Sequence, residues 1–190
     1  MGHREDLLEG AKRCLLEKGY ARTTARDVVA ASGTNLASIG YHYGSKDALL
    51  QAAFLALMEA WGDSVDQPAE AAGLPGAGPE RFEAVWRRMV SGFPVHRALW
   101  KLQIEVVARL DEDEKLAEAL RGWQVRGRTE LAQLFGGVDA GEDPERARGT
   151  GLLAQALVAG VMTQWLVDPD TAPTAEDLAE GLKALAGIPA

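Results

Sequence analysis

Several residue types and segments that mark whole classes of protein are scarce in this 190-residue chain. The single cysteine, Cys14, excludes an intramolecular disulfide, and with only three scattered histidines it makes no four-ligand zinc set. The first residues are charged, so we expect no secretory signal peptide. The longest apolar stretch, residues 152–167, is interrupted by polar side chains and is short for a membrane span. We therefore expect a cytoplasmic protein with no metal, no cofactor and no membrane partner.

Charge is distributed unevenly along the chain. The net charge is −8, but residues 1–50 carry seven basic and six acidic side chains, whereas residues 51–190 carry 13 basic and 22 acidic ones. An evenly acidic chain would argue against a nucleic-acid partner. A near-neutral first quarter leaves room for a small basic face, so the charge permits DNA binding without showing it.

The hydrophobic pattern is helical throughout. No hairpin dipeptide lies between alternating runs, and clusters of β-branched residues are few, so nothing indicates a strand. Apolar stripes bounded by caps, glycines and prolines predict an all-α fold of about nine helices. Their approximate ranges are 7–18, 24–31, 35–43, 45–61, 79–93, 99–110, 111–136, 144–168 and 174–185. The expected caps of the third, seventh and last of these helices are Asn35, Asp111 and Thr174. Residues 67–79, rich in glycine and proline, read as the only substantial linker.

The first fifty residues have the order of a helix-turn-helix: a helix, a short helix, a glycine-containing turn and another short helix. Gly33 lies where the backbone must reverse without a Cβ clash. Thr24 and Asp27 have the spacing of a capping box at the start of the second helix. The helix after the turn is roughly 12 Å long, which suits a major groove of similar width. Taken alone, such a pattern is more often helix packing than DNA binding.

The run TTARDVVAASGTNLASIGYHYGSKDALLQAAF resembles the DNA-binding region of the TetR family of transcriptional regulators. A polar cap, a short helix, a small-residue turn, a recognition helix, an aromatic-His-aromatic trio and S-K-x-x-L-L follow one another at the spacings of that family, over about residues 5–60. The chain departs from the pattern at Thr34, Gly40 and Gly44, and Gly40 offers no side chain to a base. The resemblance implies that the contacts to DNA come from Thr24, Arg26, Asn35, Leu36, Ala37, Ser38, Tyr41, His42 and Lys46. It implies that Leu36 and Ser38 face base edges.

All five tryptophans lie beyond residue 50, among methionines and glutamines. Aromatic residues at helical spacing commonly fill a core, and that interpretation stays open for each of them. An apolar cavity with a few polar groups is, however, how small-molecule sites are built. We expect part of the following set to line such a site: Trp86, Met89, Phe93, Trp100, Gln103, Trp123, Met162 and Trp165.

Small residues make one side of the penultimate predicted helix smooth. Tight packing within the chain would account for them, but the family resemblance favours a two-fold interface in which this helix and the last one form a four-helix bundle with their mates. The expected interface residues are Leu153, Ala156, Leu157, Gly160, Gln164, Leu178, Leu182 and Leu185.

The sequence thus favours a ligand-responsive transcriptional regulator, most simply a repressor. We expect a homodimer that binds a pseudo-palindromic operator in double-stranded DNA and is released by a small hydrophobic effector. Residues 1–45 would form the DNA-binding domain, 46–66 a connecting helix and 67–190 the ligand-binding and dimerisation domain. The alternatives are a small all-α lyase with its site among the tryptophans and a helical adaptor that docks on a protein. Because no nucleophile–base pair, metal set or nucleotide loop is visible, we name no catalytic residue and predict no enzyme.

Overall fold

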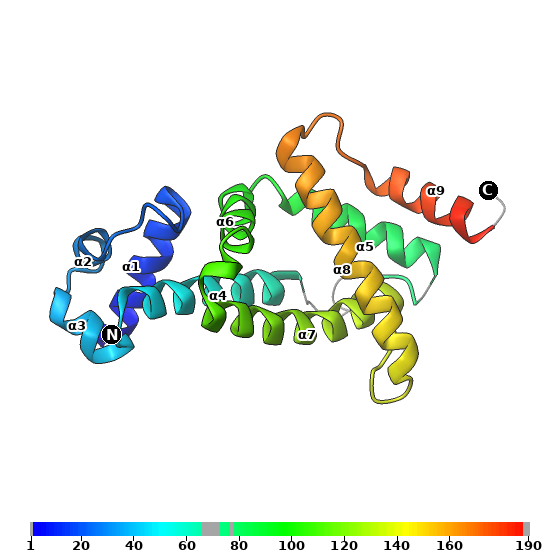
Figure 1. The fold of residues 1–190 in the computed structure, drawn as a ribbon. Coiled ribbons are helices and arrows are strands. Elements are labelled where there is room, and N and C mark those ends of the chain that lie inside the picture. Colours follow the sequence, from blue (N-terminus) through cyan, green and yellow to red (C-terminus); the bar gives the residue numbers. More distant parts are fainter. Residues whose placement is uncertain (1, 66–72, 77, 188–190) are drawn as a thin grey trace. The chain divides into compact units, whose positions relative to one another are not determined.

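The computed structural model describes residues 2–65, 73–76 and 78–187, and over these residues all regular secondary structure is helical (Figure 1). This described part contains nine α-helices and one short 3-10 helix, so the expected all-α fold is confirmed. The predicted linker lies partly outside the described residues. The helices are α1 His3–Lys18, α2 Ala25–Ser32, α3 Leu36–Tyr43, α4 Lys46–Val65, α5 Pro79–Gly92, α6 Arg97–Val107, the 3-10 helix η1 Leu110–Glu112, α7 Glu114–Gly136, α8 Pro144–Val167 and α9 Ala175–Ala186.

The N-terminal caps explain where several helices begin. Thr24 and Asp27 form the expected capping box of α2: the backbone N–H of Asp27 donates to Thr24 Oγ1 over 3.2 Å, and the backbone N–H of Thr24 donates to Asp27 Oδ2 over 2.9 Å. Thr174 caps α9 in the same way. Gly33 ends α2 in the left-handed conformation, with φ of 68°.

Two local expectations need correction. The cap of α7 is Asp113 and not Asp111, because residues 110–112 form η1 and the N–H of Leu116 donates to Asp113 Oδ1. The extent of α8 agrees with the predicted range 144–168, but the helix is longer than the apolar stretch on which the membrane argument rested. At 24 residues it is long and apolar enough to cross a membrane by length and composition alone, although 28% of its most apolar 18-residue window is buried within the chain.

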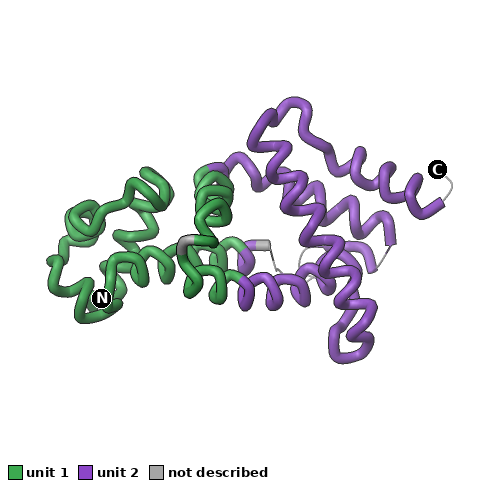
Figure 2. The backbone as a smooth tube through the Cα atoms, viewed as in Figure 1, with its two compact units in different colours: residues 1–61, 98–120 green, residues 62–97, 121–190 purple. Residues whose placement is uncertain are grey.

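The chain divides into two compact units, one within residues 1–61 and 98–120 and the other within residues 62–97 and 121–190 (Figure 2). The division falls inside α4, directly after the first residue of α6 and inside α7. Three helices therefore contribute to both units. The predicted functional division at residues 45 and 66 remains a prediction.

In the first unit, α1, α2 and α3 enclose a small apolar core. Leu7 and Leu15 of α1, Val28 of α2 and Ile39 of α3 are all buried. A Cβ atom at Gly10 would lie 2.8 Å from the Cβ atom of Ser32, so glycine lets the end of α2 approach α1 closely. These contacts fix α3 on the other two helices and leave its opposite side exposed.

The second unit is built around aromatic side chains from three helices. The rings of Phe82 and Trp86 in α5 contact the ring of Phe135 in α7, with centroids 5.7 and 5.3 Å away. Phe93 contacts Trp165 of α8 at 5.7 Å. Aromatic pairs at such separations add specific geometry to the burial of apolar area. They make a dense core for this unit.

Candidate DNA-binding surface and ligand pocket

The exposed face of α3 is the first candidate surface. Leu36 is 54% exposed and Tyr41 is 86% exposed, and Ala37 and Gly40 are exposed between them. These four positions lie on one side of the helix, because residues four apart in a helix are neighbours. The surface offers methyl groups, bare backbone and one phenol, which suits apolar contacts with thymine methyl groups in a major groove.

Ser38 occupies the other side of α3, contrary to the expectation that its side chain faces a base. It is only 8% exposed, and both its N–H and its hydroxyl donate to Asn35 Oδ1, over 3.0 and 3.2 Å. Asn35 is thus the N-cap of α3, and the Ser38 hydroxyl belongs to that cap. Both residues shape the start of the recognition helix.

An ion pair lies at the start of α2. Lys18 Nζ lies 2.5 Å from Asp27 Oδ1 and thereby joins the end of α1 to α2. Hydrogen bonds from Lys18 and then from Thr24 hold the pKa of Asp27 well below its usual range, and the same contact raises the pKa of Lys18. The predicted contacts Thr24 and Arg26 are exposed at this helix start, where backbone N–H groups favour an anion such as a phosphate.

The C-terminal end of α3 contacts the first turn of α1. The hydroxyl of Tyr43 donates to the carbonyl oxygen of Arg4 over 2.8 Å, and the Arg4 guanidinium lies 5.5 Å from the centre of the Tyr43 ring. His42 is partly buried and its ring meets the Tyr41 ring edge-on at 4.8 Å. Sequence reasoning identified the aromatic trio but did not find its anchor at Arg4.

Lys46 is the first residue of α4 and follows directly on this region. Its side chain is 37% exposed, and its Nζ lies 2.9 Å from Asp47 Oδ1. An exposed ion pair of this kind contributes little to stability. The ammonium group can therefore exchange the carboxylate of Asp47 for a phosphate at small cost.

The residues proposed for ligand binding do not gather in one described cavity. Trp100 and Gln103 belong to the first unit, and the other six belong to the second. Most of the set is buried as core: Trp86, Met89, Phe93, Trp100, Met162 and Trp165. The indole N–H of Trp86 is buried and has no hydrogen-bond acceptor among the described residues.

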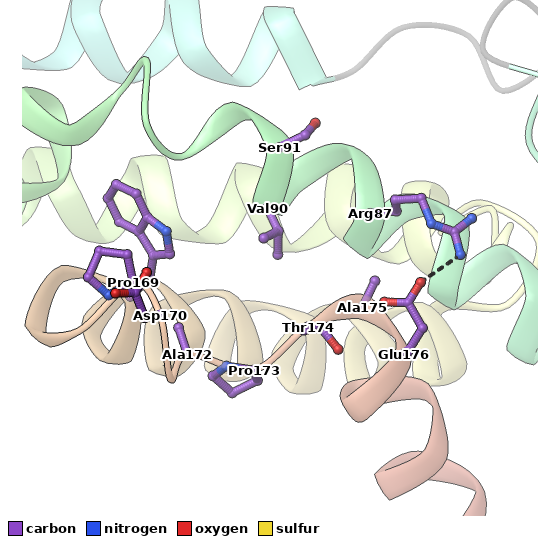
Figure 3. A pocket seen from close by; sticks show the side chains of 11 residues that line it. Arg87, Val90, Ser91, Pro169, Asp170, Ala172, Pro173, Thr174, Ala175 and Glu176 are labelled. Atoms are coloured by element: carbon purple, nitrogen blue, oxygen red, sulfur yellow. Dashed lines mark hydrogen bonds and ion pairs between the residues drawn. The ribbon is translucent and has the colours of Figure 1, made fainter.

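A pocket of about 320 Å³ opens in the second unit between α5, the end of α8 and the start of α9 (Figure 3). Of the predicted ligand residues only Trp165 lines it. Its polar lining includes Arg87, whose guanidinium donates to Glu176 Oε1 over 2.9 Å and also pairs with Glu83. The remaining lining is Val90, Ser91, Pro169, Asp170, Ala172, Pro173, Thr174 and Ala175.

The outer side of α8 carries the predicted dimer residues. Leu153 is 55% exposed, and Ala156, Gly160 and Gln164 continue an exposed stripe at helical spacing. Leu157 is half-buried. On α9, Leu185 is 90% exposed, while Leu178 and Leu182 are half-buried. The exposed side of α8 is therefore open to a partner, and the dimer interface remains a prediction.

A recognition-like helix with an exposed face, held by a helix-turn-helix and followed by a helical body, defines the class of DNA-binding transcriptional regulators. The family described as "Bacterial regulatory proteins, tetR family" matches residues 7–53, and "BetI-type transcriptional repressor, C-terminal" matches residues 79–186. The chain belongs to the TetR family of transcriptional regulators, with a BetI-type C-terminal domain. This is a family of regulators and not of enzymes, which confirms that expectation.

Three individual proteins illustrate the similarity. The chain is 43% identical over 54 residues to the transcriptional repressor AcnR of Corynebacterium efficiens, a match over 28% of this chain and 27% of that protein. It is 30% identical over 135 residues to the repressor Rv1474c of Mycobacterium tuberculosis, over 68% of this chain and 60% of the relative. The crystal structure of the multidrug binding protein EbrR with proflavin has a TM-score of 0.66 at 23% identity, over 97% and 99% of the two chains. That last likeness establishes the fold.

Proposed function

We propose that this protein is a cytoplasmic, homodimeric repressor that binds a pseudo-palindromic operator and is released by a small hydrophobic ligand. The observation that carries the proposal is the exposed face of α3, with Leu36, Ala37, Gly40 and Tyr41 toward solvent and Ile39 buried in the opposite direction. A surface of this kind has no role in the core of its own unit. It is suited to read base edges, while Thr24, Arg26 and Lys46 contact phosphates.

The exposed stripe of α8 supports a dimer. One recognition helix covers only a few base pairs, so a single copy would select a site poorly, whereas two copies related by a two-fold axis read two half-sites about one helical turn apart or somewhat more. A second copy of the chain would cover Leu153 on α8 and Leu185 on α9, and such an isologous contact buries the same residues of both protomers.

The pocket of the second unit supports a hydrophobic ligand with no net negative charge. Most of its wall is apolar, and the single cationic side chain in it, Arg87, is neutralised by Glu176 and Glu83. Asp170 leaves one further carboxylate in the lining. The binding of proflavin, an aromatic cation, to EbrR is consistent with this class of ligand.

DNA binding is tested by selecting duplexes from a random pool with the purified full chain and then titrating the enriched duplex at several salt concentrations. Lys46→Ala should weaken binding to all sequences alike and reduce the slope of log affinity against log salt by about one, because it removes one phosphate contact. Leu36→Ala and Tyr41→Phe should instead change the preference at particular base pairs. Failure of the wild type to enrich any duplex refutes the function.

Ligand release is tested with a probe that does not itself intercalate, since proflavin binds DNA directly. We suggest benzyltrimethylammonium, with benzoate as the oppositely charged control. The ammonium compound should change tryptophan fluorescence saturably and weaken operator binding, and Asp170→Asn should reduce both effects. Exposed Asp139→Asn is the matched control in the same unit. Equal responses to the two compounds, or none to either, would argue against the proposed ligand class.

A further inference from the structure

The turn between α1 and α2 is held by a carboxylate from a distant part of the chain. Glu105, in α6, accepts a hydrogen bond from the backbone N–H of Tyr20 at Oε2, over 3.0 Å, and one from the N–H of Ala21 at Oε1, over 2.7 Å. Each carboxylate oxygen thus takes one amide, 85 and 84 residues away in sequence. Hydrogen bonds with an ionised acceptor are roughly twice as strong as neutral ones.

Neighbouring residues accommodate this contact closely. Gly19 has φ of 85°, a conformation that favours glycine, and a Cβ atom there would lie 2.5 Å from Glu105 Oε2, so a larger residue would displace the carboxylate. The Tyr20 side chain is 7% exposed, and its burial raises the pKa of the phenol to about 12. The Thr23 hydroxyl, also buried, donates to the carbonyl oxygen of Gly19 over 2.7 Å. The backbone of the turn is thus bonded to Glu105 through the amides of Tyr20 and Ala21, and to Thr23 through the carbonyl oxygen of Gly19.

This contact matters because of what the turn connects. The turn follows Lys18, the last residue of α1, and leads directly to Thr24, which is the N-cap of α2 and a predicted phosphate contact. Helix α6 is a single continuous helix whose first residue, Arg97, is counted in the second unit, where its guanidinium lies 5.1 Å from the centre of the Trp165 ring. Glu105 lies near its other end, in the first unit.

We propose that Glu105 is a positioning residue for DNA binding: by bonding the amides of Tyr20 and Ala21, it fixes the orientation of the helix-turn-helix on α6. The carboxylate touches no DNA. It restricts the orientations that the recognition helices can take before they bind the two half-sites. Because a preorganised surface loses less entropy on binding, this restriction should strengthen DNA binding. The effect on operator affinity rests on the proposed function, whereas the effect on the turn does not.

The first test measures the turn alone, by amide hydrogen exchange in the full-length protein. In Glu105→Ala, and in the near-isosteric Glu105→Gln, the amides of Tyr20 and Ala21 should exchange at least about tenfold faster than in the wild type, because charged hydrogen bonds are lost. Glu118→Gln, an exposed acid on α7 in the same unit, is the matched control and should change neither amide. Unchanged exchange of these amides in both Glu105 variants would overturn the proposal.

The second test uses the selected operator and a copy with one base pair inserted between its half-sites. Both Glu105 variants should bind the operator about tenfold more weakly at an unchanged salt slope, and the insertion should weaken their binding by a smaller factor than it does for the wild type. A variant that is only less stable would lose affinity on insertion of the base pair by the same factor as the wild type, and this factor is called the spacing penalty. Affinity and spacing penalty equal to those of Glu118→Gln would overturn the positioning role. If the wild type selects no DNA, the function fails, and hydrogen exchange still decides the contact.

Discussion

Removal of the Arg81 side chain should be among the most damaging single changes in the second unit. Arg81 is 4% exposed, and its guanidinium donates to the carbonyl oxygens of Leu134 over 2.7 Å, Gln133 over 2.9 Å and Pro75 over 3.0 Å. Two of these carbonyls belong to the last turn of α7: that of Gln133 also accepts from the N–H of Gly137 over 2.9 Å, whereas that of Leu134 lies beyond the reach of the helix amides. A cation there also complements the negative end of the helix dipole.

The expected cost follows from these bonds. Arg81→Ala leaves the buried carbonyl group of Leu134 without a donor, at about 1–3 kcal/mol, and also removes the charge-assisted bonds to Gln133 and Pro75, so we expect a loss of about 3 kcal/mol in the free energy of unfolding. Arg81→Lys keeps the charge but not the planar fork, and it should lose roughly half as much. Urea denaturation followed by circular dichroism measures both.

Arg88→Ala is the matched control, because Arg88 lies on the same helix and, among the described residues, donates to one carbonyl oxygen, that of Ser64. It should lose less than about 1 kcal/mol, as expected for a half-exposed contact. A loss for Arg81→Ala as small as that for Arg88→Ala would refute the reasoning, since it would mean that the carbonyl group of Leu134 finds another donor.

Three further predictions concern the turn of the helix-turn-helix, a charged cap and the interface. Gly33→Ala should destabilise by about 1 kcal/mol in urea, because φ is 68° although the space around it is open. Asp27→Asn should lower the free energy of unfolding at pH 7. The difference from wild type should shrink as the pH falls below about 4, because a carboxyl with a lowered pKa stabilises the fold only while it is ionised. A pH-independent difference in urea midpoints would contradict this. Leu153→Glu should shift sedimentation toward the monomer, whereas Val95→Glu, at a site 82% exposed, should not.

Local signals in the sequence predicted the fold well. Thr24 with Asp27, Asn35 and Thr174 cap helices because their side chains reach backbone amides three residues ahead, an interaction that needs no knowledge of the rest of the chain. The same reasoning misplaced the cap of α7 by two residues, since Asp111 and Asp113 offer the same side chain and only the intervening 3-10 helix distinguishes them.

The parts of the site that depend on tertiary contacts were not predictable. Ser38 was expected to face a base, but the side of α3 that packs on α1 and α2 is decided by helices outside its own segment. Nothing in the sequence pattern singles out Glu105 or Arg81, because their partners lie 84 and 53 residues away. The tryptophans suggested a pocket by their number. Whether each one fills the core or lines a pocket depends on tertiary packing, which the periodicity of the sequence does not specify.

The central claim is that two copies of this chain bind one symmetric operator through the exposed face of α3. The most direct test is the mass of the complex between the full chain and the duplex selected from the random pool, measured by native mass spectrometry together with the consensus of the selected sequences. The account predicts an even number of chains per duplex, with two as the simplest case, and an inverted repeat in the consensus. A single chain bound to an asymmetric site would contradict it.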